Sequence, residues 1–376
     1  MNAWDMEHYQ ISDTSEILSP ALVVFRPLVR QNIDQMIRIA GGASRLRPHC
    51  KTHKMAAVTQ MELAAGIVKH KCATLAEAQM LADAGVKDIF LAYNLVGPNI
   101  QRAVRFLDRY PDVRLSVTAD HPEPLQQLSK AFAGRPHTIG VILDVNTGLN
   151  RTGVDPESDE ALQIYRLMAS LPGLRPEGLH AYDGQNHQTD VEERRQAVMR
   201  VWEAAARLRD RLLAAGLPVP RIVAGGTGSF PIFARLDDPA IEVSPGTTIF
   251  HDWGYGTLFP DLPFAVAALL LTRVISRPTA NRLTVDLGNK AVAADPPMGQ
   301  RVFFPDLPDA RQVLHNEEHL VLETDRASAY QPGDVLLAIP RHICPTCAWH
   351  QMAWVIEGGR VVDRWPVTAR DRWIDI

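Results

Sequence analysis

The sequence predicts an α/β protein in which a (β/α)8 barrel of the TIM type is joined to a second, C-terminal all-β domain. Short apolar runs typical of buried strands alternate with helical stretches through the first two thirds of the chain, which indicates a parallel sheet. Counted from residue 45 there are eight such runs, the number of strands that closes a barrel. After about residue 255 the apolar runs are separated by Pro, Gly and Asp turns and show little helical periodicity.

We expect the barrel domain to cover residues 21–255. Each predicted strand is an apolar run bounded by polar, Gly or Pro residues. The two clearest helices, 76–84 and 192–214, are rich in Ala, Leu, Glu and Arg and are closed by Gly85 and Gly216. The predicted strands are 21–25, 45–50, 67–72, 88–93, 114–118, 139–145, 178–182, 221–224 and 241–243.

We expect the all-β domain to cover residues 256–376, joined by about the first 20 residues. Turn residues separate its apolar runs, and no helical period connects one run to the next. The predicted strands of this domain are 265–275, 282–287, 319–323, 334–339 and 352–356.

Composition excludes several classes of protein. Hydrophobic residues make up 46% of the chain and charged residues 22%, a balance typical of globular proteins and not of disordered ones. The net charge of −4, without a strongly basic domain, argues against a nucleic-acid binder. The longest apolar run, 264–271, is shorter than the ~20 residues that a membrane helix needs. With no signal-peptide pattern and only four cysteines, we expect a cytoplasmic protein without a disulfide framework.

The most unusual segment is RPHCKTHK, residues 47–54, which follows directly on a predicted barrel strand. Active sites of barrels lie at the carboxyl ends of the strands. A lysine there, partly desolvated and crowded by other cations, would have a lowered pKa and could form a Schiff base. The alternative from composition alone is a solvated basic turn.

Two Gly-rich turns follow the seventh and eighth counted strands: GGTGS at residues 225–229 and SPGTT at residues 244–248. Such turns present backbone N–H groups to anions, and barrels frequently bind phosphate with these two loops. Flexible turns use the same residue types, so GGTGS alone is a weak motif. A reactive lysine together with a phosphate cradle suggests pyridoxal 5'-phosphate. The candidate phosphate residues are Gly226, Thr227, Gly228, Ser244, Gly246 and Thr247.

The chain resembles the D-threonine aldolase and D-serine dehydratase family of alanine-racemase-type, fold type III pyridoxal-phosphate enzymes. The resemblance runs in the same order from about residue 21 to the C-terminus. It implies a barrel with a β-domain, a D-amino acid substrate, a divalent metal and a homodimer with its active site at the subunit interface. The motifs that carry it are RPHCKTHK, TGLNRTGV, GLHAYDGQNH, AGGTGS, SPGTTIFHD, NEEH and RHICPT.

The resemblance also implies roles for individual residues in the barrel. Lys51 would form the Schiff base, and Arg151 would contact the phenolic oxygen of the cofactor. Tyr182 and His187 fall where the family has active-site residues: Tyr182 could bound the cofactor ring or donate a hydrogen bond, and His187 could touch the β-hydroxyl of the substrate. His180 alternates with Tyr182, and we interpret it as a packed histidine.

A third group, in the β-domain, contains His342 and Cys344. On an extended segment, residues two apart project to the same side, and imidazole with thiolate suits Zn²⁺. The Cys344–Cys347 spacing could also be half of a zinc ribbon or a redox pair, although no second CxxC occurs, and a buried structural pair is a further alternative. The family resemblance implies His342 and Cys344 as metal ligands, leaves Cys347 out, and makes His319, more than His315, a candidate for orienting them.

Two reactions fit these parts. Breaking Cα–Cβ of a β-hydroxy amino acid gives glycine and an aldehyde, whereas loss of the α-proton and the hydroxyl gives a 2-oxo acid and ammonia. VGP at 96–98 and GGTGS resemble the aldolases, whereas Cys344 matches the dehydratases and favours Zn²⁺ over Mn²⁺. We expect a D-threonine aldolase-like lyase, with a D-serine or D-3-hydroxy-amino-acid dehydratase as the alternative.

Two further alternatives are less favoured. An alanine racemase would have an arginine where Ser244 precedes Pro245, and a tyrosine motif that is missing around 286–288. A non-catalytic pyridoxal-phosphate carrier would have the barrel alone, without the candidate metal pair. The expected partner is a small-molecule D-amino acid substrate, and neither nucleic acid nor membrane is expected.

Overall fold

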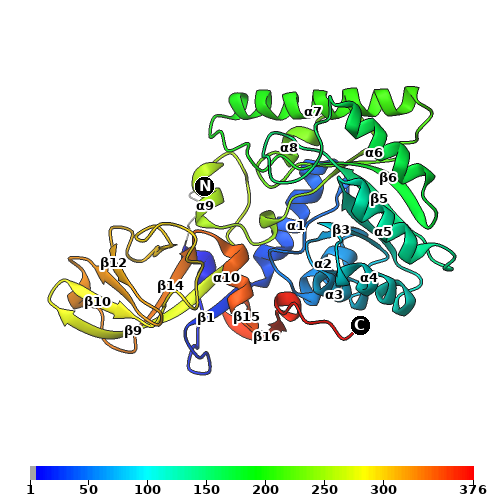
Figure 1. Cartoon of the computed structure of the whole chain (residues 1–376). Helices are drawn as coiled ribbons and strands as arrows, with labels where there is room; N and C mark the ends of the chain where they lie inside the picture. Colours follow the sequence, from blue (N-terminus) through cyan, green and yellow to red (C-terminus); the bar gives the residue numbers. More distant parts are fainter. Residues whose placement is uncertain (1–5) are drawn as a thin grey trace. The chain divides into compact units, whose positions relative to one another are not determined.

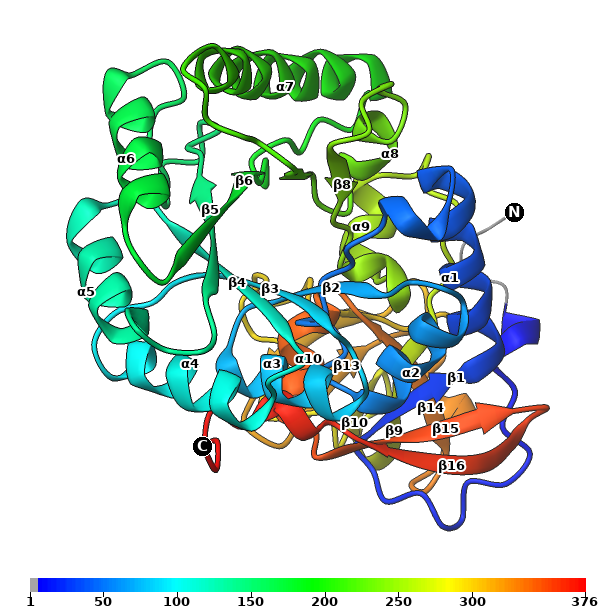
Figure 2. The same ribbon diagram turned by 90° about the vertical axis from the view of Figure 1, so that its right-hand side faces the viewer.

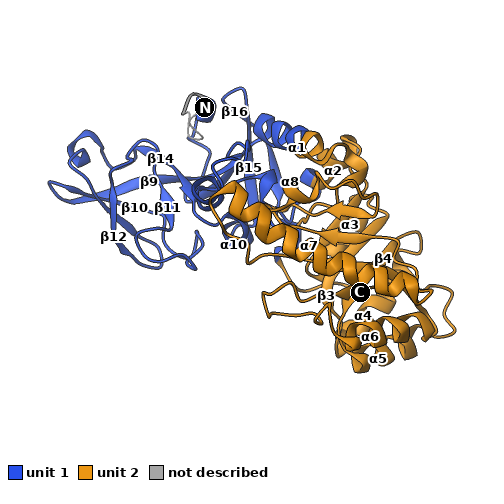
Figure 3. Ribbon diagram, turned by 90° about the horizontal axis from the view of Figure 1, so that it is seen from above, with its two compact units in different colours: residues 1–35, 52–58, 247–370 blue, residues 36–51, 59–246, 371–376 orange. Residues whose placement is uncertain are grey.

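The computed structural model describes residues 6–376, and the chain divides into two compact units (Figure 3). The first, called here the barrel unit, holds residues 36–51, 59–246 and 371–376. The second, called the β unit, holds the residues up to 35, 52–58 and 247–370.

The barrel unit is built on a parallel seven-stranded sheet in which every strand pairs with its neighbours in sequence. This topology confirms the predicted α/β barrel class. The strands form the inner layer and helices cover them from outside (Figure 2). In order they are β2 (Lys69–Cys72), β3 (Asp88–Asn94), β4 (Arg114–Ala119), β5 (Ile139–Asp144), β6 (Leu174–Ala181), β7 (Ile222–Ala224) and β8 (Ile241–Val243).

The eighth position of the barrel is occupied by residues 46–49, called here the bridged segment. They form isolated β-bridges and not a regular strand, which corrects the prediction for 45–50. Leu46 forms an isolated parallel bridge with Val243 of β8, and His49 forms one with Lys71 of β2. Pro48 between them has no N–H to donate, which interrupts a regular ladder. The segment nevertheless connects both edge strands of the sheet.

Helices alternate with these strands, and their starts follow local sequence rules (Figure 1). The side chains of Thr74, Ser158 and Asp190 accept a hydrogen bond from a backbone N–H of the helix that each precedes. The predicted helices 76–84 and 192–214 agree with α3 and α7. The division between the units falls within α1 and α2. The helices are α1 (Arg26–Ala40), α2 (Ala56–Ala64), α3 (Leu75–Asp83), α4 (Pro98–Arg109), α5 (Pro122–Phe132), α6 (Asp159–Ser170), α7 (Val191–Ala214) and α8 (Phe230–Phe233).

The β unit contains a nine-stranded sheet with the main order β12-β13-β10-β9-β1-β15-β16, and β14 pairs with β9 and β11. Its strands are β1 (Ala21–Phe25), β9 (Ala268–Thr279), β10 (Arg282–Val285), β11 (Val302–Phe303), β12 (Arg311–His315), β13 (Leu320–Glu323), β14 (Val335–Pro340), β15 (Met352–Glu357) and β16 (Arg360–Pro366). Each of the five strands expected after residue 255 overlaps one of these. The unit also holds α9 (Trp253–Leu258) and α10 (Ile343–Trp349).

Strand β1 lies within the range 21–255 expected for the barrel domain, but the structure places it in the other sheet. It runs antiparallel to β9 and parallel to β15. All five of its residues are buried, so the strand has no polar face that would reveal its neighbours in the sequence. Residues 247–255 also belong to the β unit, so the barrel unit is shorter at both ends than expected.

Five short 3-10 helices complete the described chain: η1 (Met6–Tyr9), η2 (Ala43–Arg45), η3 (Thr247–Ile249), η4 (Ala327–Ala329) and η5 (Thr368–Arg370). Among the helices of residues 6–376, none is both long and apolar enough to cross a membrane.

Candidate active site

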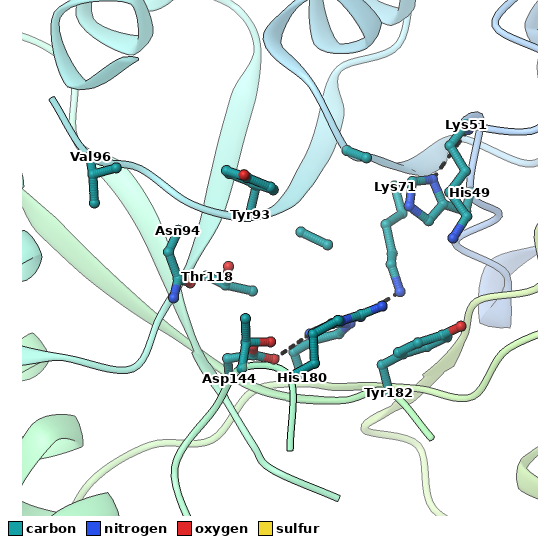
Figure 4. A pocket seen from close by; sticks show the side chains of 14 residues that line it. His49, Lys51, Lys71, Tyr93, Asn94, Val96, Thr118, Asp144, His180 and Tyr182 are labelled. Atoms are coloured by element: carbon teal, nitrogen blue, oxygen red, sulfur yellow. Dashed lines mark hydrogen bonds and ion pairs between the residues drawn. The ribbon is translucent and has the colours of Figure 1, made fainter. Parts of the chain in front are cut away.

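The carboxyl ends of the barrel strands surround a cavity of about 570 Å³ (Figure 4). Its walls come from strands β2–β6, the loops that follow them and the bridged segment. This is the end of a barrel where active sites form, because loops from several strands converge there. The lining residues are His49, Lys51, Lys71, Ala73, Ala92, Tyr93, Asn94, Val96, Thr118, Asp144, Arg151, Thr152, His180 and Tyr182.

Lys51 reaches the cavity from the turn that follows the bridged segment. Its backbone N–H donates to Nδ1 of His49 at 3.3 Å. The loop after β8 holds this segment in place, because the His49 N–H donates to the Pro245 carbonyl at 2.8 Å and the Ser244 hydroxyl donates to the Arg47 carbonyl at 2.9 Å. Ser244, a candidate for phosphate binding, therefore supports the lysine segment in this structure.

Three cationic groups surround the ring of Tyr182. The Lys51 and Lys71 Nζ atoms lie 5.9 and 5.4 Å from the ring centroid, and Cζ of Arg151 lies 5.1 Å from it. Among the described residues that line the cavity, Asp144 is the one carboxylate. The cavity therefore has an excess of positive charge, which suits an anionic ligand.

Lys71, His180 and Asp144 form a hydrogen-bonded chain along one wall of the cavity (Figure 4). Lys71 Nζ lies 3.1 Å from Nε2 of His180, and Nδ1 of His180 lies 2.8 Å from Oδ1 of Asp144. All three residues are buried. The sequence analysis did not single out Lys71 and interpreted His180 as a packed residue, although the alternation of His180 with Tyr182 places both on the cavity side.

Burial and neighbouring charges shift the pKa values in this chain of groups. Burial, helped by the charge of Lys51, lowers the pKa of Lys71 to about 7, although Asp144 opposes the shift. Burial and the charge of Lys71 also lower the pKa of His180. Burial would raise the pKa of Asp144, but the hydrogen bond from His180 holds it below its ordinary value. The cavity wall therefore holds an amine that can gain or lose a proton near neutral pH.

His187 is not among the residues that line this cavity, and its contact with the substrate stays a prediction. The residue lies in the loop after β6, is exposed, and its Nε2 contacts the Gly184 carbonyl at 2.5 Å. His187 is six residues beyond the end of the strand, whereas the residues that reach the cavity from this strand lie within or directly after it.

The Gly-rich loop after β7 contacts the segment around Tyr182 through Ser229 and Gly226. The Ser229 hydroxyl accepts from the Gly226 N–H at 3.0 Å and donates to Asp183 at 2.7 Å. A Cβ added at Gly226 would lie 3.1 Å from a ring carbon of Tyr182, so a glycine allows the close approach. None of the six candidate phosphate residues is among those that line the cavity. Thr247, the last of them, belongs to the β unit.

In the β unit, His342 and Cys344 lie at the start of helix α10 and not on an extended segment. His342 is the residue before the helix, and Cys344 is in its first turn beside Pro345, a position that proline tolerates. The helix start brings the two side chains together. Burial lowers the pKa of His342, but the sulfur of Cys344 and the carboxylate of Asp295 outweigh it and raise the value to about 9.

Several groups of the β unit fix this pair. Nδ1 of His342 contacts Oδ2 of Asp295 at 2.6 Å. The Cys344 sulfur lies 3.2 Å from the Thr52 hydroxyl and 3.6 Å from that of Thr247. Sequence reasoning missed Asp295, which lies 47 residues away along the chain.

The other candidates around this pair have different surroundings. His319 is exposed, and His315 contacts the Leu287 carbonyl at 3.1 Å and Arg301 at 3.4 Å. Cys347 is fully buried, and burial raises the pKa of its thiol. Asp295 contacts the His342 ring, whereas the contacts of His315 are with Leu287 and Arg301.

Comparison with known proteins decides the family. A family model described as alanine racemase, N-terminal domain, matches residues 27–252, more than half of the chain, and one described as putative serine dehydratase domain matches residues 267–356. D-threonine aldolase of Arthrobacter sp. is 32% identical over 331 residues, which cover 86% of this chain and 85% of the relative. The chain belongs to the D-threonine aldolase and D-serine dehydratase family. Members of this family are pyridoxal-phosphate lyases on an alanine-racemase-type fold.

Two further relatives, one an aldolase of known structure and the other a dehydratase, support this membership. The crystal structure of D-threonine aldolase from Filomicrobium marinum has a TM-score of 0.86 and 30% identity, covering 94% of this chain and 96% of that one. D-threo-3-hydroxyaspartate dehydratase of Delftia sp. (strain HT23) is 26% identical over 368 residues, which cover 92% of this chain and 96% of the relative. The family thus includes both aldolases and dehydratases.

The barrel cavity fits the cofactor of this family. Pyridoxal phosphate has an aldehyde, a phenolic oxygen and a doubly charged phosphate, and the cavity offers the amine of Lys51 with further cations at Lys71 and Arg151. The ring of Tyr182 lines the cavity and offers a flat surface on which an aromatic ring can lie.

The donor set in the β unit fits a divalent metal. Asp295 contacts Nδ1 of His342, so Nε2 is the ring nitrogen that would serve as the metal ligand. Cys344 beside it contributes a sulfur. An imidazole with a thiolate suits Zn²⁺ better than Mn²⁺, which prefers oxygen ligands.

Proposed function

We propose that this chain cleaves D-β-hydroxy amino acids by a retro-aldol reaction, which gives glycine and an aldehyde, with pyridoxal phosphate and a divalent metal ion. The observation that carries the proposal is the cationic cavity that contains Lys51 at the carboxyl ends of the barrel strands. Its excess of positive charge suits a cofactor with a phosphate and a substrate with a carboxylate. The similarity to D-threonine aldolases along most of the chain supports the aldolase reaction.

Each group has a role in this proposal. Lys51 would hold the cofactor covalently, and Arg151 would keep its phenolic oxygen ionised. Tyr182 would bound the cofactor ring, with the loop around Gly226 behind it. When bound, pyridoxal phosphate withdraws electrons from the bonds at Cα of the amino acid.

The metal would be held by His342 and Cys344, with Asp295 orienting the histidine. A divalent metal lowers the pKa of a hydroxyl that it binds, which favours loss of the hydroxyl proton. We further propose a D-amino acid substrate and a homodimer whose subunits complete each other's sites, as the resemblance to the family implies. Sedimentation velocity would test the dimer.

The second candidate function is dehydration of a D-3-hydroxy amino acid to a 2-oxo acid and ammonia. Cys344 favours it, since the resemblance to the dehydratases includes a cysteine at this position and the resemblance to the aldolases does not. The relative from Delftia shows that the family includes this reaction.

One experiment separates the two reactions. The purified chain, loaded with cofactor and Zn²⁺ or Mn²⁺, is incubated with D-threonine, D-serine and D-3-hydroxyaspartate, and glycine, aldehyde, 2-oxo acid and ammonia are measured. We expect glycine and aldehyde in equal amounts. Ammonia with a 2-oxo acid would identify the dehydratase instead, and equal turnover of the L-isomers would contradict the D-specific proposal.

Metal removal tests the role of the β unit. A chelator should abolish turnover, and Zn²⁺ or Mn²⁺ should restore it. Asp295→Asn should weaken metal binding by roughly 10–100-fold, because the imidazole loses the carboxylate that orients it. Glu318→Gln, which replaces an exposed carboxylate on the same unit, is the matched control. Full activity in the metal-free protein would contradict the proposal.

A further inference from the structure

A second group of metal-binding residue types lies beside the barrel cavity and has no role in the function proposed above. His49, Cys50 and Glu77 each offer one donor atom, and these atoms lie within 4.8 Å of one another. Cys50 and Glu77 are 1% and 0% exposed, whereas His49 lines the cavity. A buried carboxylate beside a buried thiol, with an imidazole that reaches the cavity, needs an explanation.

We propose that His49, Cys50 and Glu77 form a second metal site, which binds Zn²⁺ or a similar thiol-binding divalent ion and lowers turnover when it is filled. The site itself does not depend on the proposed retro-aldol function. Its effect on turnover rests on that function, because the ion acts on the segment that contains Lys51.

Local structure holds the donor atoms in place. The Cys50 N–H donates to the Lys71 carbonyl at 2.9 Å, which fixes the residue after the bridged segment against β2. Thr74 precedes α3, and its hydroxyl accepts from the Glu77 N–H at 3.1 Å. The Glu77 carboxylate reaches back and accepts from the Ala73 N–H at 2.6 Å. This arrangement is similar to a capping box and holds the carboxylate at the start of the helix, beside the thiol.

The distances suit a tetrahedral ion. The Cys50 sulfur lies 3.8 Å from Oε2 of Glu77. A Zn²⁺ ion bound at about 2.3 Å to a sulfur and about 2.0 Å to an oxygen holds these two atoms about 3.5 Å apart. The two atoms are thus close to the separation that the ion requires, and His49 supplies the third donor. The cavity that His49 lines gives the ion a route to the site.

Charge balance also favours a divalent ion here. Binding converts the Cys50 thiol to a thiolate and releases its proton to solvent, and Glu77 supplies a carboxylate. Two negative charges then balance the ion in a buried site. Thiolate and imidazole favour Zn²⁺ over Mn²⁺ or Mg²⁺. The cations of the cavity oppose the ion, so we expect weaker binding than at a structural zinc site.

Metal binding and a hydrogen bond that supports Lys51 exclude each other. Nδ1 of His49 accepts from the Lys51 N–H at 3.3 Å (Figure 4), so the hydrogen of the neutral ring is on Nε2. An ion on Nδ1 takes the lone pair that accepts this bond. An ion on Nε2 moves the hydrogen to Nδ1, which then cannot accept. In both cases the backbone of Lys51 loses this support, and the amine that would hold the cofactor is less well positioned.

The first test detects the ion without any turnover. The full chain is titrated with Co²⁺, and the thiolate-to-metal charge-transfer band is measured. Cys344→Ser removes the thiolate of the proposed catalytic metal site, so the band that remains should come from Cys50. Adding Cys50→Ser should abolish this band, whereas adding Cys72→Ser, at another buried cysteine of the barrel unit, should keep it. No band in Cys344→Ser, or a band that Cys50→Ser leaves unchanged, would overturn the inference.

The second test uses a variant that keeps the helix start intact. Glu77→Gln retains an oxygen that can accept from the Ala73 N–H but removes one negative charge. Calorimetric titration of Cys344→Ser with Zn²⁺ should show one ion per chain, and adding Glu77→Gln should weaken its binding by roughly 100-fold or more. Glu123→Gln, at an exposed first-turn carboxylate of α5, is the matched control. Equal affinity in the Glu77 and Glu123 variants would contradict the site.

Inhibition by zinc connects the site with turnover. Excess Zn²⁺ should lower kcat of the loaded wild type by up to roughly 10²-fold. Cys50→Ser, compared with its own rate at low Zn²⁺, should lose this inhibition. Equal inhibition of both enzymes would overturn the effect on Lys51. If the wild type cleaves no β-hydroxy amino acid, the proposed function fails, while the Co²⁺ and Zn²⁺ titrations still decide whether the site exists.

Discussion

Both ends of the barrel unit contain buried charged groups, but they are arranged differently. At the amino end, where the strands begin, three carboxylates form ion pairs with several cations. Arg47, fully buried, donates to Glu242 at 2.6 Å and to Asp88 at 2.8 Å. Arg221 lies 3.3 Å from Glu177. Burial alone would raise the pKa values of these three carboxyl groups, yet the arginines and hydrogen bonds hold all three below their ordinary values.

The carboxyl end has the opposite arrangement. Lys51, Lys71 and Arg151 surround one aromatic ring, and Asp144 is the one carboxylate among the described lining residues. Here the pKa of a buried lysine falls to about 7, because burial and like charges disfavour its charged form. The comparison indicates that the amino end serves stability, whereas the carboxyl end retains positive charge for an anionic ligand.

The largest expected effect comes from removing the cofactor lysine at the carboxyl end. Lys51→Ala should lower turnover by roughly 10⁴-fold or more, since the covalent attachment is lost. Borohydride reduction of the wild type should fix the cofactor mass on Lys51. Lys54→Ala is the control and should keep the label, whereas a label on Lys54 in the wild type would contradict the assignment.

Substitutions of the charged residues at the amino end should lower the free energy of unfolding and not affect the chemical reaction. Arg47→Met removes the buried cation that Glu242 and Asp88 share, which should lower the free energy of unfolding by about 3–5 kcal/mol. Urea unfolding followed by circular dichroism measures it. Arg109→Ala, at an exposed ion pair with Asp375, should change the free energy by less than about 1 kcal/mol. Equal effects of both variants would contradict the comparison.

The pH dependence of stability should also differ between the ends. Lys71 has a folded pKa of about 7, below its ordinary value near 10.5, so the unfolded chain binds more protons between these values. The stability of the cofactor-free chain should therefore rise from pH 7 toward pH 10, and Lys71→Met should reduce this rise by up to about 3 kcal/mol. The lowered carboxyl pKa values at the amino end contribute stability above about pH 4 that is lost as the pH falls further. An unchanged alkaline rise in Lys71→Met would show that another group causes it.

The smallest expected effect is stabilisation by a simple anion. Inorganic phosphate at ten times its Kd should stabilise the cofactor-free chain by about 1.4 kcal/mol, because it binds the folded state alone. Thermal unfolding in phosphate and in chloride of equal ionic strength measures the difference. Arg151→Gln should reduce the phosphate effect, whereas Arg114→Gln at the amino end should not. An equal loss in both variants would contradict a specific anion site at the carboxyl end.

The sequence alone determined the order of the barrel strands and helices, since apolar runs, caps and Gly stops are local signals. It also identified the motifs of the family and the residues Lys51, Arg151 and Tyr182, which the structure brings to one cavity. It likewise paired His342 with Cys344, although the reason given, an extended segment, was wrong, because Pro345 lies in the first turn of a helix.

Only the tertiary structure decided to which sheet β1 belongs, because a strand buried on both faces has no polar side that indicates its neighbours. The contact of Lys71 with His180 joins residues 109 positions apart, and that of His180 with Asp144 joins residues 36 apart. Parallel strands bring such residues together at one edge of the sheet, so spacing along the chain does not reveal them. The position of His187, exposed in the loop after β6, was likewise decided by the tertiary structure, because the path of a loop depends on what it packs against.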